Sequence, residues 1–299
     1  MKTVAVITRT KDRPLLLHRA GKSVADQTFR DFVWVIVNDG GQAQPVDEVA
    51  TQVRQDHIEV VVVHKYVSAG MEAASNTGIR GSTSEFIVIH DDDDTWHPQF
   101  LERTVPFLKS SAGALYGGVI THTIKVREEI KNDRCNIISS QPHNDWIAAV
   151  YLSDMATMNM FPPISFLFRR SLYDQIKGYD EQLPVLGDWL FNLQFLRIAD
   201  IGVIREPLAY YHQRINVSTP SYENTVLTGV GVHEQYDAII RNRLMREDIE
   251  ASRIGLGYLV NRGKDYAGPL SLLGMQRLKR KLNETRYGRV FARLLNRIG

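Results

Sequence analysis

Short, nearly continuous apolar runs alternate with longer amphipathic segments in the first third of the chain. The apolar runs predict strands at Val4–Thr8, Phe32–Asn38, Ile58–His64 and Phe86–His90. Runs rich in β-branched and aromatic residues are typical of strands that are buried on both faces. The segments between them predict helices at Pro14–Asp26, Val46–Gln55 and Gly70–Arg80. This alternation indicates an α/β fold with a mostly parallel central sheet flanked by helices and joined by right-handed crossovers.

The pattern continues less regularly up to about residue 211. It predicts helices at Pro98–Ser110, Ser171–Lys177 and Asp188–Arg197, and strands at Leu115–Lys125, Ile164–Phe168 and near Gly202–Tyr210. Beyond Tyr211 the pattern is helical, with segments at Tyr222–Leu244, Glu247–Val260 and Leu270–Ile298. We therefore expect a catalytic domain over residues 1–218 and a helical C-terminal region over 219–299, with a boundary near Ser218–Pro220.

Composition narrows the class of protein. The chain has 299 residues, 43% hydrophobic and 23% charged, which is ordinary for a soluble globular protein. Its apolar runs are too short to span a bilayer, and no leader pattern follows Met1. The single cysteine, Cys135, excludes an internal disulfide framework. These features predict a cytoplasmic protein.

Charge is distributed unevenly along the chain. Residues 270–299 carry a net charge of +7, which leaves −5 for residues 1–269. The terminal segment can be a helix that packs on the domain with a solvated basic face. It can equally be an amphipathic helix at an anionic membrane surface, which would place the protein peripherally at the inner face of the membrane.

Four consecutive aspartates, Asp91–Asp94, directly follow the strand predicted at Phe86–His90. They therefore lie at the carboxyl end of a strand, where open α/β sheets bind ligands. Carboxylate oxygens suit Mg²⁺ or Mn²⁺ shared with a substrate phosphate. The alternative is a solvated acidic loop or the start of a helix.

Polar residues also follow the first two predicted strands. These are Arg9-Thr10-Lys11-Asp12-Arg13-Pro14 and Asn38-Asp39-Gly40-Gly41. Asp39 is suited to bind a base or ribose, because the glycines after it let the backbone approach closely. It can also be an ordinary Asp-Gly turn. The sequence has neither a Gly-rich dinucleotide fingerprint nor a phosphate-binding Lys-Ser pair after these strands, which argues against dinucleotide enzymes and ordinary ATPases.

Five motifs in order resemble those of family 2 glycosyltransferases with the GT-A fold. They are Thr10-Lys11-Asp12-Arg13-Pro14, Asn38-Asp39-Gly40-Gly41, Asn76-Thr77-Gly78-Ile79, Asp91-Asp92-Asp93-Asp94-Thr95-Trp96 and Gly187-Asp188-Trp189. The resemblance covers roughly residues 1–215 and excludes the tail. It implies a nucleotide-diphospho-sugar donor, a UDP-sugar foremost, and transfer with inversion at the anomeric carbon.

The resemblance also implies roles for individual residues. Thr10 and Asp39 match positions that hold the nucleoside, and Asp93 matches the ligand of the Mn²⁺ or Mg²⁺ cofactor. Asp91 would face the ribose or the metal, and His212 is a candidate third ligand that can equally be structural. The other donor-side candidates are Lys11, Arg13, Asn76, Arg80 and Asp92. Arg80 enters because Ser75 stands where the family often has an arginine that contacts the diphosphate.

Asp188 matches the base that takes the proton of the acceptor hydroxyl. Its alternative role is to cap the helix that it opens. The family usually has glutamate before this aspartate, and Gly187 here puts an acceptor contact in doubt. The stretch Gln141–Pro163 is either an acceptor loop or a segment that packs its methionines into the core.

The sequence thus predicts a metal-dependent inverting glycosyltransferase that acts on a glycan or lipid-linked acceptor, in bacterial surface polysaccharide synthesis, with no nucleic-acid partner. Two alternatives remain at this point: an inactive nucleotide-sugar-binding module of a larger complex, and a metal-dependent nucleotidyltransferase.

Overall fold

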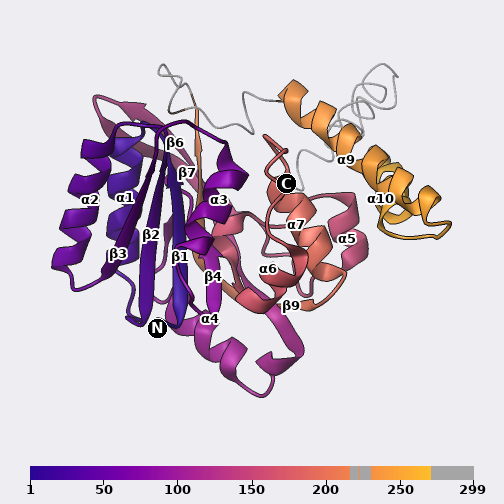
Figure 1. Ribbon diagram of the computed structural model, residues 1–299, viewed down its shortest axis with the longest axis horizontal. Coiled ribbons are helices and arrows are strands. Elements are labelled where there is room, and N and C mark those ends of the chain that lie inside the picture. The colour runs from indigo at the N-terminus through magenta and orange to yellow at the C-terminus, as the bar shows by residue number, and fades with distance from the viewer. Residues whose placement is uncertain (216–221, 223–229, 271–299) are drawn as a thin grey trace, which may run out of the picture. The chain divides into compact units, whose positions relative to one another are not determined.

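The computed structural model describes residues 1–215, 222 and 230–270 of the chain (Figure 1). The chain divides into two compact units. The first consists of Met1–Leu152 and Asn159–Ala238, and the second of Ser153–Met158 and Ile239–Gly299. The boundary expected at Ser218–Pro220 lies outside the described residues.

The first unit is built on one mixed sheet, to which nine strands of the described segments contribute. Their bounds are β1 Val4–Thr10, β2 Phe32–Asp39, β3 Glu59–Lys65, β4 Phe86–Ile89, β5 Thr95–Trp96, β6 Tyr116–Lys131, β7 Arg134–Pro142, β8 Phe166–Arg169 and β9 Asp200–Arg214. Their order is β3-β2-β1-β4-β8-β6-β9-β5, with β7 paired to β6. The first four strands pair in parallel, as predicted, whereas β8 joins β4 and β6 in antiparallel fashion.

Helices cover both faces of the parallel half of this sheet (Figure 1). Their bounds are α1 Pro14–Ala25, α2 Ala43–Gln55, α3 Met71–Arg80 and α4 Phe100–Lys109. Trp34 and Ile36 of β2 belong to the core formed with α1, α2 and α4. Val35 and Val37 point to the opposite face, which α3 covers. Because both faces are covered, all eight residues of β2 are buried, which explains its unbroken apolar run.

A glycine brings α3 close to the sheet. A Cβ atom on Gly78 would lie 2.5 Å from Ile7 Cγ2 and 3.0 Å from Val37 Cγ2, so a larger residue would push the helix outward. The close approach places the N-terminus of α3 beside the carboxyl ends of β1 and β2.

The second half of the first unit holds elements that the hydrophobic pattern predicted less well. Strands β5 and β7 were not predicted, and β6 is longer than expected. The β6–β7 turn is formed by Asn132 and Asp133, with φ of 52° and 53°. Two successive residues with positive φ are the mark of a tight hairpin turn, and Asn and Asp tolerate this conformation well. The remaining short elements are η1 Gly113–Leu115, α5 Leu152–Thr157, η2 Pro163–Ser165, α6 Arg170–Ile176 and α7 Gly187–Leu196.

The second unit contains most of α5, the end of α9 (Val230–Glu250) and α10 (Leu256–Leu270). The prediction of one helix over Glu247–Val260 is wrong. The chain turns after α9 because the Asp248 carboxylate accepts hydrogen bonds from the amides of Gly255 and Tyr258. The helix predicted at Leu270–Ile298 lies almost wholly outside the described residues. Among the described helices, none has the length and apolar character needed to cross a membrane.

Candidate active site

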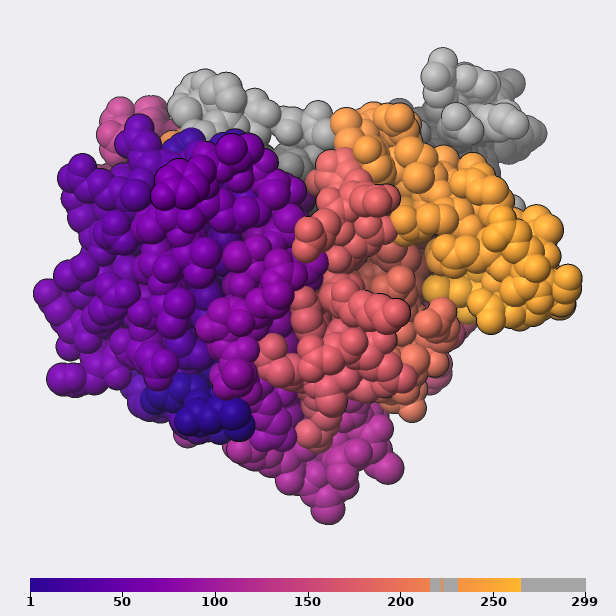
Figure 2. All heavy atoms as spheres, viewed as in Figure 1, coloured from indigo at the N-terminus to yellow at the C-terminus, as the bar shows by residue number. Residues whose placement is uncertain are grey.

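A cleft of about 680 Å³ lies at the carboxyl ends of β1, β2 and β4. Its other walls come from the N-terminus of α3, the segments at 159–163 and 185–188, and the end of β9. Figure 2 shows the N-terminal segments (indigo to purple) against the later ones (salmon) on one face of this unit. Eight of the predicted site residues line the cleft, namely Thr10, Lys11, Arg13, Asp39, Asp91, Asp92, Asp93 and Asp188.

Asp39 ends β2 and organises the loop that precedes α3. Its carboxylate accepts hydrogen bonds from Ser68 Oγ at 2.7 Å and from the amides of Ala69 and Gly70 at 3.0 Å. Although burial opposes ionisation, these bonds lower the pKa of Asp39. Gly40 makes the turn possible, because it has φ of 82° and a Cβ there would lie 2.6 Å from the Ser68 nitrogen. The Asp-Gly pair is therefore both a turn and a wall of the cleft.

The four aspartates alternate between outward and inward positions. The side chains of Asp91 and Asp93 are 22% and 15% exposed. Those of Asp92 and Asp94 are almost fully buried. This alternation separates the run into two pairs with different surroundings.

The outward pair is matched with arginines. Asp91 Oδ1 accepts a hydrogen bond of 2.8 Å from Arg9 Nε. Asp93 Oδ2 lies 2.5 Å from Arg214 Nη2 and 3.4 Å from Arg13 Nη1. Burial opposes ionisation of Asp93, but the arginines outweigh it and lower its pKa. Asp93 is therefore held as a carboxylate.

The inward pair supports the loop. Thr10 Oγ1 donates a hydrogen bond of 2.7 Å to Asp92 Oδ2, and burial raises the pKa of Asp92 to about 6. Asp94 Oδ1 accepts the amide of His212 at 2.8 Å, and burial together with the negative charge of Asp93 raises its pKa further. These two carboxyls tie the aspartate run to β1 and β9.

Arg9 takes the place that the sequence left open for Arg80. Its guanidinium lies in the cleft wall and donates to Ser75 Oγ at 2.8 Å. Arg80 does not reach the cleft: its side chain is 63% exposed and lies 3.8 Å from Glu181. The expectation for Arg80 is corrected accordingly, because the arginine beside Ser75 comes from β1 and not from α3.

Asn76 also fails to line the cleft. Its Nδ2 donates to the Tyr179 carbonyl and to Glu181 Oε1, both at 2.9 Å. Its Oδ1 accepts from the Tyr173 hydroxyl at 2.7 Å and from the Tyr179 amide at 3.0 Å. The side-chain amide is therefore fully used in fixing the segment that follows α6, and the predicted donor contact is replaced by a structural role.

His212 is buried behind the cleft and does not line it. Its Nδ1 lies 2.9 Å from Glu128 Oε2, and its Nε2 lies 2.9 Å from Thr95 Oγ1. Because both ring nitrogens have protein partners, His212 is not placed to ligate a metal in the cleft. Burial lowers its pKa, despite the nearby glutamate. The same glutamate is paired with Arg19 Nη1 at 2.6 Å.

Asp188 lies in the first turn of α7. Its Oδ2 accepts a hydrogen bond of 2.7 Å from Asn159 Nδ2, and its Oδ1 accepts the amide of Trp189 at 2.8 Å. Leu186 before it has φ of 64°, a strained conformation for a branched residue, which turns the helix start toward the cleft. Burial raises the pKa of Asp188. Leu186 is the N-cap residue of α7 and no described side chain caps this helix, so Asp188 does not take the capping role: its carboxylate accepts the amide of the next residue and lines the cleft.

The stretch Gln141–Pro163 has features of both alternatives considered for it, a loop at the cleft and a segment packed into the core. His143, Asn159 and residues 161–163 line the cleft. Met160 is 3% exposed, whereas Trp146 and Tyr151 are 58% and 60% exposed. The sequence did not single out Asn159, and nothing in its local pattern marked it.

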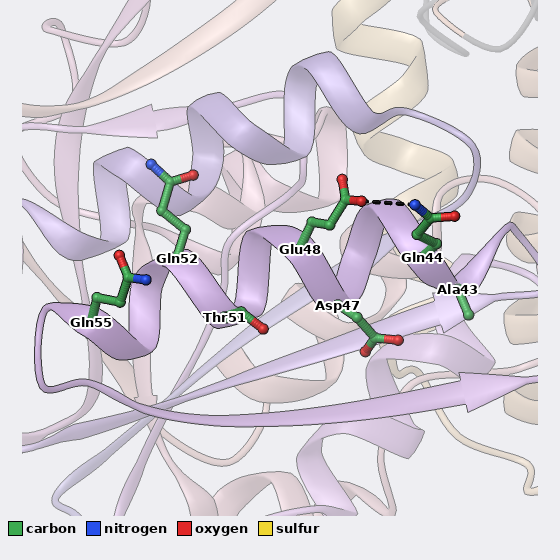
Figure 3. Close-up of a pocket in the computed structure, with 7 residues that line it drawn as sticks. All are labelled: Ala43, Gln44, Asp47, Glu48, Thr51, Gln52 and Gln55. Atoms are coloured by element: carbon green, nitrogen blue, oxygen red, sulfur yellow. Dashed lines mark hydrogen bonds between the residues drawn. The ribbon is translucent and has the colours of Figure 1, made fainter.

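A second hollow lies along the outer surface of α2 (Figure 3). It is lined by Ala43, Gln44, Asp47, Glu48, Thr51, Gln52 and Gln55, and it shares no residue with the cleft. Gln44 and Glu48 hydrogen-bond to each other across it at 2.9 Å. We assign no chemistry to it.

A mixed sheet flanked by helices, with a carboxylate-rich cleft at its parallel strand ends, is the architecture of the GT-A fold. The chain belongs to glycosyl transferase family 2, whose family model matches residues 4–177. It is 26% identical over 252 residues to an uncharacterized glycosyltransferase of Nostoc, covering 80% of this chain and 76% of that one. It is 24% identical over 193 residues to a PGL/p-HBAD biosynthesis glycosyltransferase of Mycobacterium tuberculosis, covering 64% and 68%.

Solved structures show the same fold. S. aureus TarS in complex with UDP-GlcNAc matches with a TM-score of 0.58 and 19% identity, over 73% of this chain and 60% of that one. The mannosyltransferase PcManGT of Pyrobaculum calidifontis, in complex with GDP-Man and Mn²⁺, matches with a TM-score of 0.56 and 15% identity, over 97% and 83%. The predicted family and fold are thus confirmed.

Proposed function

We propose that the protein is an inverting glycosyltransferase that moves a sugar from a nucleotide diphosphate to a hydroxyl of a glycan or lipid-linked acceptor in bacterial surface polysaccharide synthesis. The observation that carries this proposal is one cleft lined both by Asp93, whose carboxylate is paired with arginines and has a lowered pKa, and by Asp188, whose pKa is raised by burial. The mycobacterial relative, a PGL/p-HBAD biosynthesis glycosyltransferase, supports a role in biosynthesis.

The donor's nucleoside would lie between the ends of β1 and β2. Thr10 and Asp39 form that wall, and Lys11 and Arg13 supply positive charge for the diphosphate. Arg9 adds a third cation beside Asp91. A UDP-sugar is the foremost expectation. GDP-sugars belong in the same test, because one matching structure holds UDP-GlcNAc and another holds GDP-Man.

A divalent cation would be held by the carboxylates of Asp91 and Asp93, two residues that line the cleft. Among the described residues, no group of three or more His, Cys, Asp or Glu side chains is placed to hold a metal. Mg²⁺ and Mn²⁺ are often held by one or two carboxylates together with substrate phosphates, so two aspartates suffice. When bound, the cation would neutralise the charge that develops on the leaving diphosphate.

Asp188 would act as the base. It takes the proton of the acceptor hydroxyl while the hydroxyl oxygen forms a bond to the anomeric carbon. The bond from that carbon to the diphosphate breaks on the opposite face, which inverts the configuration. A raised pKa makes Asp188 a stronger base than an exposed aspartate, provided that the pH keeps it ionised.

A ligand screen tests the proposal. The melting temperature of the full chain is measured with UDP, GDP, UDP-GlcNAc and GDP-mannose, each with Mn²⁺, since a ligand stabilises the state that it binds. Release of nucleotide diphosphate is then measured with the sugars that bind. Stabilisation together with release supports the proposal. Binding without release at any pH would favour an inactive module, and release of pyrophosphate would indicate a nucleotidyltransferase.

The basic segment 270–299 adds a separate proposal, that the protein adsorbs to anionic membranes. Its support is the net charge of +7 over that segment. Sedimentation with phosphatidylglycerol vesicles should remove the full chain from solution, whereas a chain that ends at residue 269 should stay in the supernatant. Equal sedimentation of both chains would contradict the proposal.

A further inference from the structure

Gly187 leaves a space that the side chain of Glu72 fills. A Cβ atom on Gly187 would lie 2.4 Å from Glu72 Cδ and 2.5 Å from Glu72 Oε1. Real Cβ atoms do not approach other atoms so closely, so a side chain at position 187 and the present position of Glu72 exclude each other. The carboxyl of Glu72 therefore stands where a side chain preceding Asp188 would begin.

Glu72 is poorly compensated for a buried acid. It is 3% exposed, and its Oε2 has no hydrogen-bond partner among the described residues. The nearest cation is Arg9, whose Nη1 lies 3.6 Å from that oxygen. An unsatisfied buried carboxylate costs stability, so its presence calls for a function.

The titration of Glu72 agrees with this geometry. Burial raises its pKa to about 7, against the attraction of Arg9. The other charged or titratable groups that act on it are Asp188 of α7, Asp91 after β4, and Asp180 and Tyr179 before α7. Such a carboxyl can donate or accept a hydrogen bond near neutral pH.

Glu72 lines the same cleft as Asp188 and Asn159. We propose that Glu72, from α3, is the second acidic group of the acceptor site and hydrogen-bonds an acceptor hydroxyl beside Asp188. It does so in place of an acidic residue at position 187. This inference rests on the proposed glycosyl transfer.

The two positions that depart from the family pattern, Ser75 and Gly187, lie beside Arg9 and Glu72 respectively. The hydroxyl of Ser75 accepts a hydrogen bond from Arg9, and Gly187 leaves room for Glu72. Arg9 Nη1 lies 3.6 Å from Glu72 Oε2. A cation on the donor side and an acid on the acceptor side are both supplied from other elements of the fold.

The variant Glu72→Gln tests the proposal, because it keeps the size of the side chain and removes its charge. The exposed Glu59 of β3 provides the matched control, Glu59→Gln. The probes are the nucleotide sugar chosen by the ligand screen, water as acceptor, and a panel of methyl glycosides as sugar acceptors. For Glu72→Gln we expect kcat/KM for the methyl glycoside to fall roughly 10- to 100-fold, mainly through KM, as for a lost hydrogen bond to a charged group. Glu59→Gln should leave the donor KM, donor hydrolysis by water and transfer to the methyl glycoside within about threefold of wild type, because Glu59 is exposed and lies outside the cleft.

A second experiment moves the carboxylate from position 72 to position 187 and asks whether transfer is restored. Gly187→Ala alone should lower the melting temperature, because its Cβ collides with Glu72, and adding Glu72→Ala should relieve the collision. The double variant Glu72→Ala with Gly187→Glu should recover part of the lost transfer. If wild type transfers sugar and Glu72→Gln matches Glu59→Gln in acceptor KM, the inference is overturned and the proposed function stands. If wild type releases no nucleotide diphosphate, both are overturned.

Discussion

Asp93 and Asp188, on the two sides of the cleft, have opposite electrostatic surroundings. On the donor side, arginines face Asp91 and Asp93 at 2.8 Å and 2.5 Å, and the pKa of Asp93 is lowered. On the proposed acceptor side, the hydrogen-bond donors to Asp188 within the described part of the chain are neutral, namely Asn159 and the Trp189 amide, and burial raises its pKa. The carboxylate proposed to hold the cation is thus paired with arginines, whereas the one proposed to act as the base forms no ion pair with any described residue.

This contrast explains why sequence alone cannot rank the acids of the chain. Asp93 and Asp188 are the same residue type, both follow a strand or open a helix, and both line the cleft. Their environments separate them, because Asp93 faces Arg13, which precedes α1, and Arg214 of β9, and these two arginines lie far apart in sequence. The experiments below test each side in turn.

The substitution Asp188→Asn should have the largest effect on transfer. It keeps the shape and removes the base, so kcat should fall about 10³-fold, within the range of general-base catalysis. Binding of the nucleotide diphosphate with Mn²⁺, measured by calorimetry, should be unchanged. Full turnover by this variant would show that the acceptor side has no proton acceptor at position 188.

The substitution Asp93→Asn should act on the donor side. It removes a charge that faces the buried guanidinium of Arg214 and that is proposed to hold the cation. We expect transfer to fall roughly 10²-fold and nucleotide-diphosphate affinity in Mn²⁺ to fall about tenfold, since a cation site is weakened. Calorimetry with and without Mn²⁺ measures this. An affinity that stays equal to wild type in Mn²⁺ would break the proposed role of Asp93.

The substitution Glu72→Gln should change how stability depends on pH. The pKa of Glu72 is raised from 4.5 to about 7 in the folded protein, so the folded state binds more protons than the unfolded state between these values. Its contribution to stability is therefore fully present below about pH 4.5 and is lost as pH rises to 7, by up to about 3 kcal/mol.

Urea unfolding of both proteins across this pH range measures the effect. Wild type should lose stability relative to Glu72→Gln as pH rises. Parallel curves would show that Glu72 is ionised at its ordinary pKa, which would remove the acceptor side's contrast with the donor side.

The substitution His212→Gln should affect folding and not metal binding. It removes hydrogen bonds to Glu128 and Thr95, so the free energy of unfolding should fall by about 1–3 kcal/mol. The Mn²⁺ concentration for half-maximal activity should stay the same. A rise of tenfold or more in that concentration would indicate that His212 is a metal ligand.

Arg80→Ala should have the smallest effect. Its side chain is 63% exposed and outside the cleft, so donor KM should change less than about twofold. Arg9→Lys is the matched comparison, because Arg9 lines the cleft, and its donor KM should rise several-fold. Equal effects of the two variants would show that the cation beside Ser75 has no part in donor binding.

Much of the fold could be predicted because local pattern and burial coincide in the parallel half. The run from Phe32 to Val37 is apolar throughout, and its strand is buried on both faces. The long β6–β7 hairpin was harder, because β7 is mostly exposed and carries little apolar signal. The pair Asn132-Asp133 was the available signal for its turn.

Residues that line the cleft were predictable where they come at the end of a strand, as Thr10, Asp39 and the aspartate run do. Arg9 and Glu72 also line the cleft but were missed, although Arg9 directly precedes Thr10 and Glu72 lies in the helix predicted at Gly70–Arg80. Their role depends on which small residues, Ser75 and Gly187, lie against them in space. That information is absent from any local window of the sequence.

Glu128 of β6 links the N-terminal helix α1 to the late strand β9. It is fully buried and pairs with Arg19 of α1 and His212 of β9, while Arg214 of β9 also faces Asp93. A fragment that ends before β9 would retain every donor-side motif up to Asp94, yet it would lack Arg214, the cation that β9 supplies to Asp93. The residues up to Asp94 should therefore not bind nucleotide as an isolated fragment. A shortened chain should need β9 as well.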